Sequence, residues 1–285
     1  VTEDSFVYLT EKSAIAFPHL LMSPIMKTKG GVIISLGDLC RWLAEQAEAL
    51  GVDVFPGTAA ADFLTGENGE ILGIVTGDMG IARDGSHKPT FTPGIELRAK
   101  YTLIAEGARG SLAKRLIAKF GLDEGRAPQK YGLGIKEIWE IDPAKHKPGK
   151  VTHFMGYPLG NSTSGGGFCY HAQDNRIYLG LVAHLDYENP TFSPFGEFQR
   201  FKQHPEIAKL LEGALALPGG ALIGCAAGFM NVPRLKAIHN AIRSGMAAAS
   251  EVAEAIAADR ANDEITTLDE AVLSSGIRDD LYPVR

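Results

Sequence analysis

The sequence predicts an α/β (α+β) fold in which helix and strand units accompany a separate antiparallel sheet. A helical pattern over residues 35–50 leads directly into an extended segment, and the order strand, loop, helix recurs over 96–120 and 221–258. Between these parts, residues 131–187 form a series of extended segments separated by turns. Such a series is typical of an antiparallel subdomain.

The first helix is expected to begin at Ser35, which forms a capping pair with Asp38. Apolar residues then recur at helical spacing as far as Leu50, and Gly51 is a typical stop. A strand over 52–55 is predicted to follow. Glu67-Asn68-Gly69 between two apolar runs, 59–64 and 71–76, indicates a hairpin, and Asp84-Gly85 indicates a second reversal.

The remaining elements follow from the same signals. We expect a strand over 96–105, a helix over 111–120, and the antiparallel strands 131–141, 151–156, 167–171 and 177–185. Helices are predicted near 195–203 and 206–212, a short strand over 221–223, and a long Ala-rich helix over about 238–258.

The composition and charge of the chain indicate its structural class and exclude several kinds of partner. The 285 residues are 45% apolar and 22% charged, which indicates a globular chain with one large or two modest domains. A net charge of −6 without a basic block makes nucleic acid an unexpected partner. Apolar runs stay short of the ~20 residues of a spanning helix, and the acidic start does not resemble a signal peptide. The absence of an initiator Met suggests a piece of a longer protein.

Several classes of site are excluded. Cys40, Cys169 and Cys225 are too far apart for a zinc knuckle and too few for a four-thiolate cluster, and such sparse use suits a reducing compartment. The eight histidines show no metal-binding spacing. Neither a Gly-x-Ser-x-Gly elbow nor a phosphate-binding Gly-Lys-Ser/Thr loop occurs, so hydrolase and nucleotide-triphosphatase functions are not expected.

The loop that precedes the last long helix is the most informative local feature. It contains Gly224, Cys225 and Gly228, followed by Phe229, Met230 and Asn231. Small residues let a ligand approach the backbone, and the helix N-terminus behind them favours an anionic group. A reduced flavin carries negative charge near its N1–C2=O edge and would suit this place. An ordinary strand-to-helix turn is the alternative.

Three other segments also allow more than one interpretation. Glu106 and Gly107 end a predicted strand and could meet a ribose or pyrophosphate, with Arg109 as a counter-charge, or could form a plain helix cap. The run Gly165-Gly166-Gly167 suggests a flat ligand or another backbone close by, or a bulge. The apolar, proline-interrupted segment 17–26 could line a pocket, touch a membrane surface or be buried in the core.

The chain resembles the electron-transfer flavoprotein:ubiquinone oxidoreductase family (electron-transferring-flavoprotein dehydrogenases). Five runs in the expected order carry the resemblance and span nearly the whole chain: 43–52, 105–107, 131–137, 185–190 and 224–233. The resemblance implies an incomplete FAD-binding domain of the GR2-type Rossmann-like class with an inserted antiparallel quinone-binding subdomain. Its expected parts are a quinone-pocket and membrane-facing segment (1–34), an FAD-domain portion with hairpins (35–130), the ubiquinone-binding domain (131–212), and a closing strand and helix (213–285).

The resemblance also implies roles for residues. The positions expected at FAD are Glu106, Gly107, Gly224, Cys225, Gly228, Phe229, Met230 and Asn231. Gly165 and Gly166 match the glycine pair whose backbone meets the quinone head group, and no residue is assigned a catalytic or metal-binding role. The implied activity passes electrons from reduced electron-transfer flavoprotein through FAD to ubiquinone at a membrane surface, as a monotopic contact. That surface would be the cytoplasmic face of a bacterial inner membrane or the matrix side of the mitochondrial one.

The sequence also departs from the family pattern. It contains neither the N-terminal Gly-x-Gly-x-x-Gly turn nor the C-terminal cysteines that hold a 4Fe–4S cluster in this family, so it resembles an internal segment. The chain alone is therefore expected to bind FAD weakly. Two other functions stay open: a related FAD-dependent reductase or hydroxylase of the para-hydroxybenzoate hydroxylase class, and a non-catalytic remnant that binds quinone or lipid.

Overall fold

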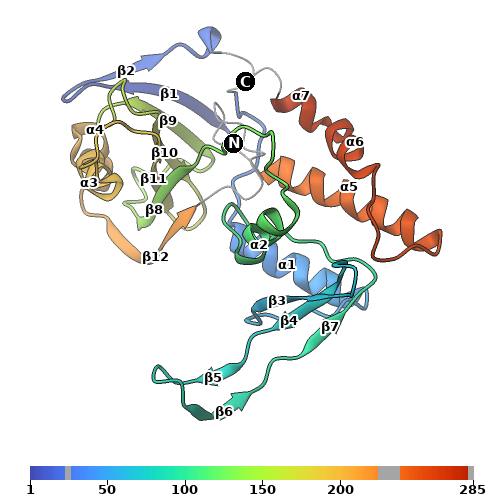
Figure 1. Cartoon of the computed structure of the whole chain (residues 1–285). Coiled ribbons are helices and arrows are strands. Elements are labelled where there is room, and N and C mark those ends of the chain that lie inside the picture. The colour runs from blue at the N-terminus through green and yellow to red at the C-terminus, as the bar shows by residue number, and fades with distance from the viewer. Residues whose placement is uncertain (23–26, 224–237, 282–285) are drawn as a thin grey trace. The chain divides into compact units, whose positions relative to one another are not determined.

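The computed structural model describes residues 1–22, 27–223 and 238–281 (Figure 1). The chain divides into two compact units. The first unit comprises Val1–Gln46 and Pro128–Cys225, and the second comprises Ala47–Ala127 and Ala226–Arg285. Each unit is formed by two stretches of chain that are distant in sequence.

A seven-stranded sheet forms the first unit, with the strand order β12-β8-β11-β10-β9-β1-β2. The β1–β9 pair is parallel and the other pairs are antiparallel. The strands are β1 (Glu3–Leu9), β2 (Ala14–Phe17), β8 (Gly132–Glu140), β9 (Lys150–Gly156), β10 (Gly165–His171), β11 (Arg176–His184) and β12 (Leu215–Ile223).

The predicted antiparallel strands between 131 and 185 are confirmed as β8 to β11. Two features were not predicted. Strand β1, at the N-terminus, pairs in parallel with β9, although the two strands are far apart in sequence. The last strand, β12, begins at Leu215 rather than at 221, and its register against β8 shifts between Leu217 and Ala221. A shift of this kind is how an antiparallel pair accommodates extra residues in one strand.

Two helices cover one face of this sheet, α3 (Pro194–Gln203) and α4 (Pro205–Leu211) (Figure 1). Ser193 caps α3, because its Oγ accepts a hydrogen bond of 3.1 Å from the Gly196 backbone N–H. Phe198 and Phe201 of α3 and Ile207 of α4 are almost fully buried against the sheet residues Phe154, Cys169, Leu179 and Leu181. This apolar layer closes the first face of the sheet.

The helix predicted from Ser35 is confirmed as α1 (Leu36–Ala49), and Ser35 Oγ accepts from the Asp38 N–H at 3.4 Å. Before it, the 17–26 segment is extended at Phe17 and forms a 3₁₀ turn, η1 (His19–Leu21). Residues 23–26 lie outside the described residues.

The second unit contains a three-stranded sheet of order β3-β4-β7 and a β5–β6 hairpin. Both predicted reversals are confirmed, at Asn68-Gly69 and at Asp84-Gly85. The elements are β3 (Ala60–Thr65), β4 (Ile71–Thr76), β5 (Met79–Ile81), β6 (His87–Thr92), β7 (Glu96–Arg98), α2 (Ser111–Phe120), α5 (Ile238–Ala257), α6 (Leu268–Val272), the π-helical turn η4 (Leu273–Ile277) and α7 (Arg278–Leu281).

Two strand predictions in this unit are wrong. Residues 52–55 form no strand, and the strand expected over 96–105 is limited to β7. Apolar β-forming residues become a strand only where a neighbour supplies backbone hydrogen bonds. Within the described residues, β4 pairs with Glu96–Arg98 and no strand pairs with 101–105.

Candidate functional site

The second face of the first unit's sheet, opposite α3 and α4, carries the polar candidates. Side chains alternate between faces along a strand, and the register places one set of residues together. Phe6 pairs with His153, and His153 pairs with Phe168. The second face therefore bears Asp4, Phe6, His153, Gly166, Phe168 and Tyr170.

The glycine run 165–167 is explained by close neighbours in the sheet. Gly165 has a φ of 147°, and a Cβ there would lie 2.1 Å from the Val182 carbonyl oxygen. A Cβ on Gly166 would lie 2.5 Å from the Phe154 carbonyl oxygen, and one on Gly167 would lie 2.5 Å from the Phe201 ring. Of the expected interpretations, a backbone close by accounts for Gly165 and Gly166. A close aromatic ring accounts for Gly167.

Asp4 and His153 meet on the second face. The Asp4 carboxylate is 1% exposed, and its Oδ2 accepts hydrogen bonds from the backbone N–H and the hydroxyl of Thr28, the latter at 2.7 Å. Its Oδ1 lies 3.9 Å from His153 Nε2. The His153 ring stacks on Phe6 with a centroid distance of 4.8 Å. A carboxylate fixed in this way can orient a neighbouring imidazole.

Tyr170 completes this cluster. Its ring meets the His153 ring edge to face, with 6.0 Å between centroids, and lies 4.9 Å from the Phe168 ring. Burial, together with the charge of Asp4, raises the pKa of Tyr170 to about 12. The phenol therefore stays protonated at neutral pH and can act only as a neutral polar group.

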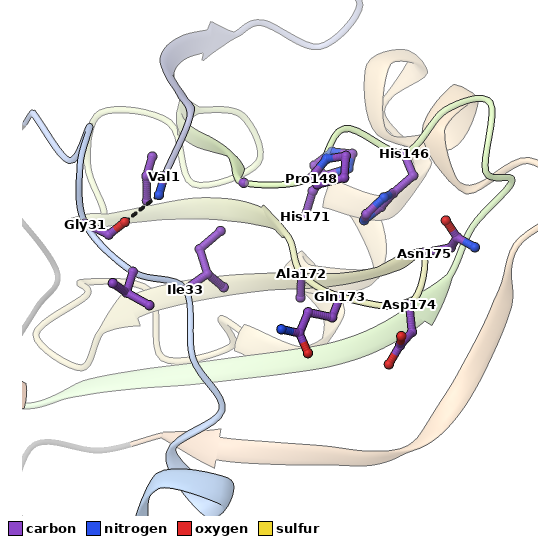
Figure 2. Close-up of a pocket in the computed structure, with 12 residues that line it drawn as sticks. Val1, Gly31, Ile33, His146, Pro148, His171, Ala172, Gln173, Asp174 and Asn175 are labelled. Atoms are coloured by element: carbon purple, nitrogen blue, oxygen red, sulfur yellow. Dashed lines mark hydrogen bonds between the residues drawn. The ribbon is translucent and has the colours of Figure 1, made fainter.

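A cavity of about 520 Å³ lies elsewhere in the first unit and contains none of the predicted site residues (Figure 2). It is lined by the 31–33 and 172–175 segments and by two histidines, His146 and His171, whose ring centroids are 5.3 Å apart. His171 Nδ1 accepts a 3.1 Å hydrogen bond from the Lys147 N–H. Burial first, and then the positive charges of His146, Lys150 and Lys147, lower the pKa of His171 to about 4.

In the second unit, Glu106 caps a helix. Its Oε2 accepts a 2.8 Å hydrogen bond from the backbone N–H of Ala113 in the first turn of α2. A Cβ on Gly110 would lie only 2.4 Å from the Glu106 side chain, and Gly107 has a φ of 94°. The sequence allowed Glu106 and Gly107 either to meet a ribose or pyrophosphate or to form a helix cap. The hydrogen bond from Ala113 corresponds to the helix cap.

Glu106 also lines a cavity of about 380 Å³ with Thr102, Leu112 and residues of the 97–105 segment. The Thr102 Oγ1 atom is buried there without a hydrogen-bond partner. Thr102 and Glu106 line the same cavity, and a hydroxyl and a carboxylate are groups that a sugar hydroxyl can bind. The cavity thus has suitable chemistry for a ribose.

The other positions expected at FAD lie outside the described residues, namely Gly224, Cys225, Gly228, Phe229, Met230 and Asn231. The helix behind them, α5, is described from Ile238. At its start, Asp280 accepts from the Asn240 amide at 3.1 Å and pairs with His239 Nε2 at 2.9 Å. Across the described ranges, no group of three or more His, Cys, Asp or Glu side chains could hold a metal ion.

Sequence reasoning missed Asp4 and His153. His153 lies between the apolar residues Val151 and Met155 on one face of its strand, which is a weak sign of a buried polar residue, but no sequence signal connects it with Asp4. Only the β1–β9 pairing brings the two together.

Comparisons with known proteins agree with this architecture. Residues 131–223, which contain strands β8 to β12 and both covering helices, match the family model "ETF-QO, ubiquinone-binding". The electron transfer flavoprotein-ubiquinone oxidoreductase of Pseudomonas aeruginosa is 47% identical over 99% of this chain and 55% of its own length. The resemblance to this family is confirmed.

The mitochondrial electron transfer flavoprotein-ubiquinone oxidoreductase of Homo sapiens is 44% identical over the whole of this chain and 50% of its own length. The chain thus spans about half the length of the curated relatives it matches. No helix among the described residues is both long and apolar enough to cross a membrane.

Solved structures show the same fold at low identity. A geranylgeranyl bacteriochlorophyll reductase-like protein from Thermoplasma acidophilum matches with a TM-score of 0.67 and 18% identity, over 98% of this chain and 67% of that one. The halogenase PltM matches with a TM-score of 0.62 and 11% identity, over 98% and 57%. The α/β fold with an antiparallel sheet, predicted from the sequence, is confirmed.

Proposed function

We propose that this chain forms the quinone-binding part, and a portion of the FAD-binding part, of an electron transfer flavoprotein-ubiquinone oxidoreductase. In this proposal, reduced electron-transfer flavoprotein supplies electrons that pass through FAD to ubiquinone in a respiratory chain. The single observation that carries it is the family match over 131–223, which coincides with the strands that bear Gly165, Gly166 and His153. The family match and the polar face thus lie in one sheet.

The quinone head group is proposed to lie against the second face at Gly165 and Gly166. The first face is covered by Phe198 and Phe201 of α3, so the ligand is proposed to approach from the other side of the sheet. Gly166 has no side chain, and the Phe154 carbonyl oxygen lies close to where its Cβ would be, whereas Phe168, two residues on, places its ring over Gly180. A flat head group can approach the backbone where a Cβ is missing.

FAD is proposed to use Glu106 and Gly107 together with Gly224, Cys225, Gly228, Phe229, Met230 and Asn231. In the described part, Thr102 Oγ1 and the Glu106 carboxylate fit the hydroxyl groups of a ribose. When bound, the flavin supplies the electrons that reduce the quinone. The residues of this chain position and desolvate the quinone.

A contact with a bilayer surface is proposed for β2 and η1. Leu20 is 87% exposed and Leu21 is 76% exposed, and Ile15 and Phe17 are exposed beside them. A cluster of large exposed apolar residues marks a surface that leaves water on binding. The surface concerned would be the cytoplasmic face of a bacterial inner membrane or the matrix side of the mitochondrial inner membrane.

The test is a titration of the isotope-labelled chain with ubiquinone-1, a short-tailed quinone, followed by NMR. We expect saturable shifts of the Gly165 and Gly166 amide signals and no shift of the 173–175 amides beside the other cavity. A titration with 4-hydroxybenzoate provides the comparison for a hydroxylase-type substrate. Absence of quinone-dependent shifts at Gly165 and Gly166 overturns the proposal.

A further inference from the structure

Strand β2 and the exposed leucines of η1, Leu20 and Leu21, form an apolar tip at the edge of the first unit's sheet. All four residues of β2 are exposed, and β2 is the last strand in the order of this sheet. Leu20 is 87% exposed and Leu21 is 76% exposed. An apolar edge of this kind marks a surface that leaves water when a partner binds.

The segment that carries the apolar tip has a charge opposite in sign to that of the whole chain. Residues 10–30 contain three lysines, Lys12, Lys27 and Lys29, and one acidic residue, Glu11, whereas the whole chain has a net charge of −6. All three lysines are exposed. Within the described part of the chain, the lysines that form ion pairs are others. The three charges beside the tip are therefore available to a partner.

Residues 27–29 are held beside the tip by Thr28. The Thr28 hydroxyl donates a 2.7 Å hydrogen bond to Asp4 of β1, and its backbone N–H donates to the same carboxylate. Phe17 pairs with Phe6, which lies two residues from Asp4 on the same face of β1. The backbones of Asp4 and Phe17 are thus about 8 Å apart, two residues along one strand and one strand across. This separation is shorter than the Debye length of about 10 Å at 0.1 M salt.

Lys12 lies at the other end of β2. It belongs to the turn between β1 and β2, three residues before Ile15. Ile15 pairs with Tyr8 and therefore projects from the same face of the sheet as Phe17. The apolar tip thus has one lysine at its first end and two lysines near its second end.

The acidic residues near the tip offset little of this positive charge. The Glu3 carboxylate pairs with Lys150 Nζ at 2.7 Å. The Asp4 carboxylate is 1% exposed and accepts the hydrogen bonds of Thr28. Glu11, in the turn between β1 and β2, is exposed and opposes the lysines. A net positive charge remains around the tip.

We propose that Lys12, Lys27 and Lys29 bind the phosphates of anionic phospholipids while the apolar tip enters the surface of the bilayer. The inference deepens the bilayer contact of the proposed function and rests on it. Binding at a membrane surface combines the burial of apolar side chains with the attraction between basic residues and acidic headgroups. A lipid headgroup is the source of the anion, because a soluble phosphate would leave the apolar tip in water.

The test is co-sedimentation of the full chain with two kinds of vesicle. One kind consists of phosphatidylcholine alone, and the other of equal parts of phosphatidylcholine and phosphatidylglycerol. We expect tighter binding to the vesicles with phosphatidylglycerol, since each lysine close to an anionic surface strengthens binding about fivefold. This preference should disappear at about 1 M salt, where the Debye length falls to about 3 Å.

Matched variants separate the charges from the apolar surface. Lys27→Gln and Lys29→Gln should each weaken binding to the phosphatidylglycerol vesicles about fivefold and leave binding to phosphatidylcholine unchanged. Lys88→Gln, on the exposed β6 strand of the second unit, is the control and should bind both kinds of vesicle as the wild type does. Leu20→Ser should weaken binding to both kinds by the same factor, because apolar burial does not depend on headgroup charge.

The outcomes distinguish this inference from the proposed function. Wild-type chain that binds neither kind of vesicle overturns the bilayer contact itself. Equal binding of the wild type to both kinds, or equal binding of Lys27→Gln, Lys29→Gln and wild type to the phosphatidylglycerol vesicles, overturns the role of the lysines and leaves the bilayer contact in place. The quinone site is judged separately, by the NMR titration with ubiquinone-1.

Discussion

His153 Nε2 lies 3.9 Å from Asp4 Oδ1, although the two residues lie at opposite ends of a long stretch of chain. Their meeting depends on the parallel pairing of β1 with β9, in which Asp4 faces Val151 and Phe6 faces His153. Asp4 is itself held by Thr28. A carboxylate that is fixed by hydrogen bonds can orient a neighbouring imidazole without further ordering.

Substitution of Gly167 tests how closely helix α3 packs on the glycine run 165–167. Gly167→Ala should destabilise the chain by about 1–3 kcal/mol, because the new Cβ would lie 2.5 Å from the buried Phe201 ring. Denaturant unfolding measures this change. Gly245→Ala is the control, since nothing lies within 4 Å of a Cβ there and a helical alanine should stabilise by up to ~1 kcal/mol. Equal stability of Gly167→Ala and wild type would contradict the packing of α3 on this strand.

The cap at Glu106 predicts a loss of stability without any ligand. Glu106→Ala removes the acceptor for the Ala113 N–H in α2 and should cost about 0.5–2 kcal/mol. Thermal melting in the absence of flavin measures this cost. Glu67→Ala, in the exposed turn between β3 and β4, is a matched control that should change little. A Glu106 variant that melts like the wild type would leave this residue with a ligand role only.

Acid should weaken the first unit through His171. Its pKa is lowered to about 4 in the folded chain, mainly by burial, and has the ordinary value of 6.5 when unfolded. Between these values the unfolded chain binds a proton that the folded chain does not, so the free energy of unfolding falls as the pH falls from 6.5 to about 4. Urea unfolding at several pH values measures the slope.

The variant His171→Gln should flatten this pH dependence, because glutamine has no proton to bind. His87→Gln, on the exposed β6 strand, should retain the wild-type slope. Identical slopes for all three proteins would show that His171 is not the group responsible.

Exposed leucines of η1 predict binding to lipid vesicles. Leu20→Ser or Leu21→Ser should weaken partitioning about tenfold each, from the loss of about 1.5 kcal/mol of apolar burial per side chain. Co-sedimentation with vesicles of bacterial inner-membrane lipids measures this. Phe195→Ser changes a side chain that is 60% exposed in α3 and should leave the partitioning intact. Equal losses in all variants would argue against a contact at η1.

The chain alone should bind FAD weakly. Glu106 and Gly107 are present, but the sequence as given contains no Gly-x-Gly-x-x-Gly turn for the pyrophosphate. Mixing the chain with FAD and recording flavin absorbance after gel filtration checks this. A yellow protein with stoichiometric flavin would show the prediction to be wrong.

Local patterns in the sequence determined the elements that depend on neighbouring residues. Ser35 and Asp38 predicted the start of α1, Asn68-Gly69 predicted the β3–β4 hairpin, and the turn-separated apolar runs predicted β8 to β11. Capping, turn conformation and side-chain alternation act over a few residues, so they can be recognised without the fold.

Only the tertiary structure decided which distant segments pair. It placed β1 beside β9, so that Asp4 reaches His153, and it left residues 101–105 without a strand partner in the described part of the chain. It also assigned Glu106 to a helix cap and set Phe201 against Gly167. Strand pairing and core packing join residues that are remote in sequence, and their free energies depend on neighbours that no local pattern specifies.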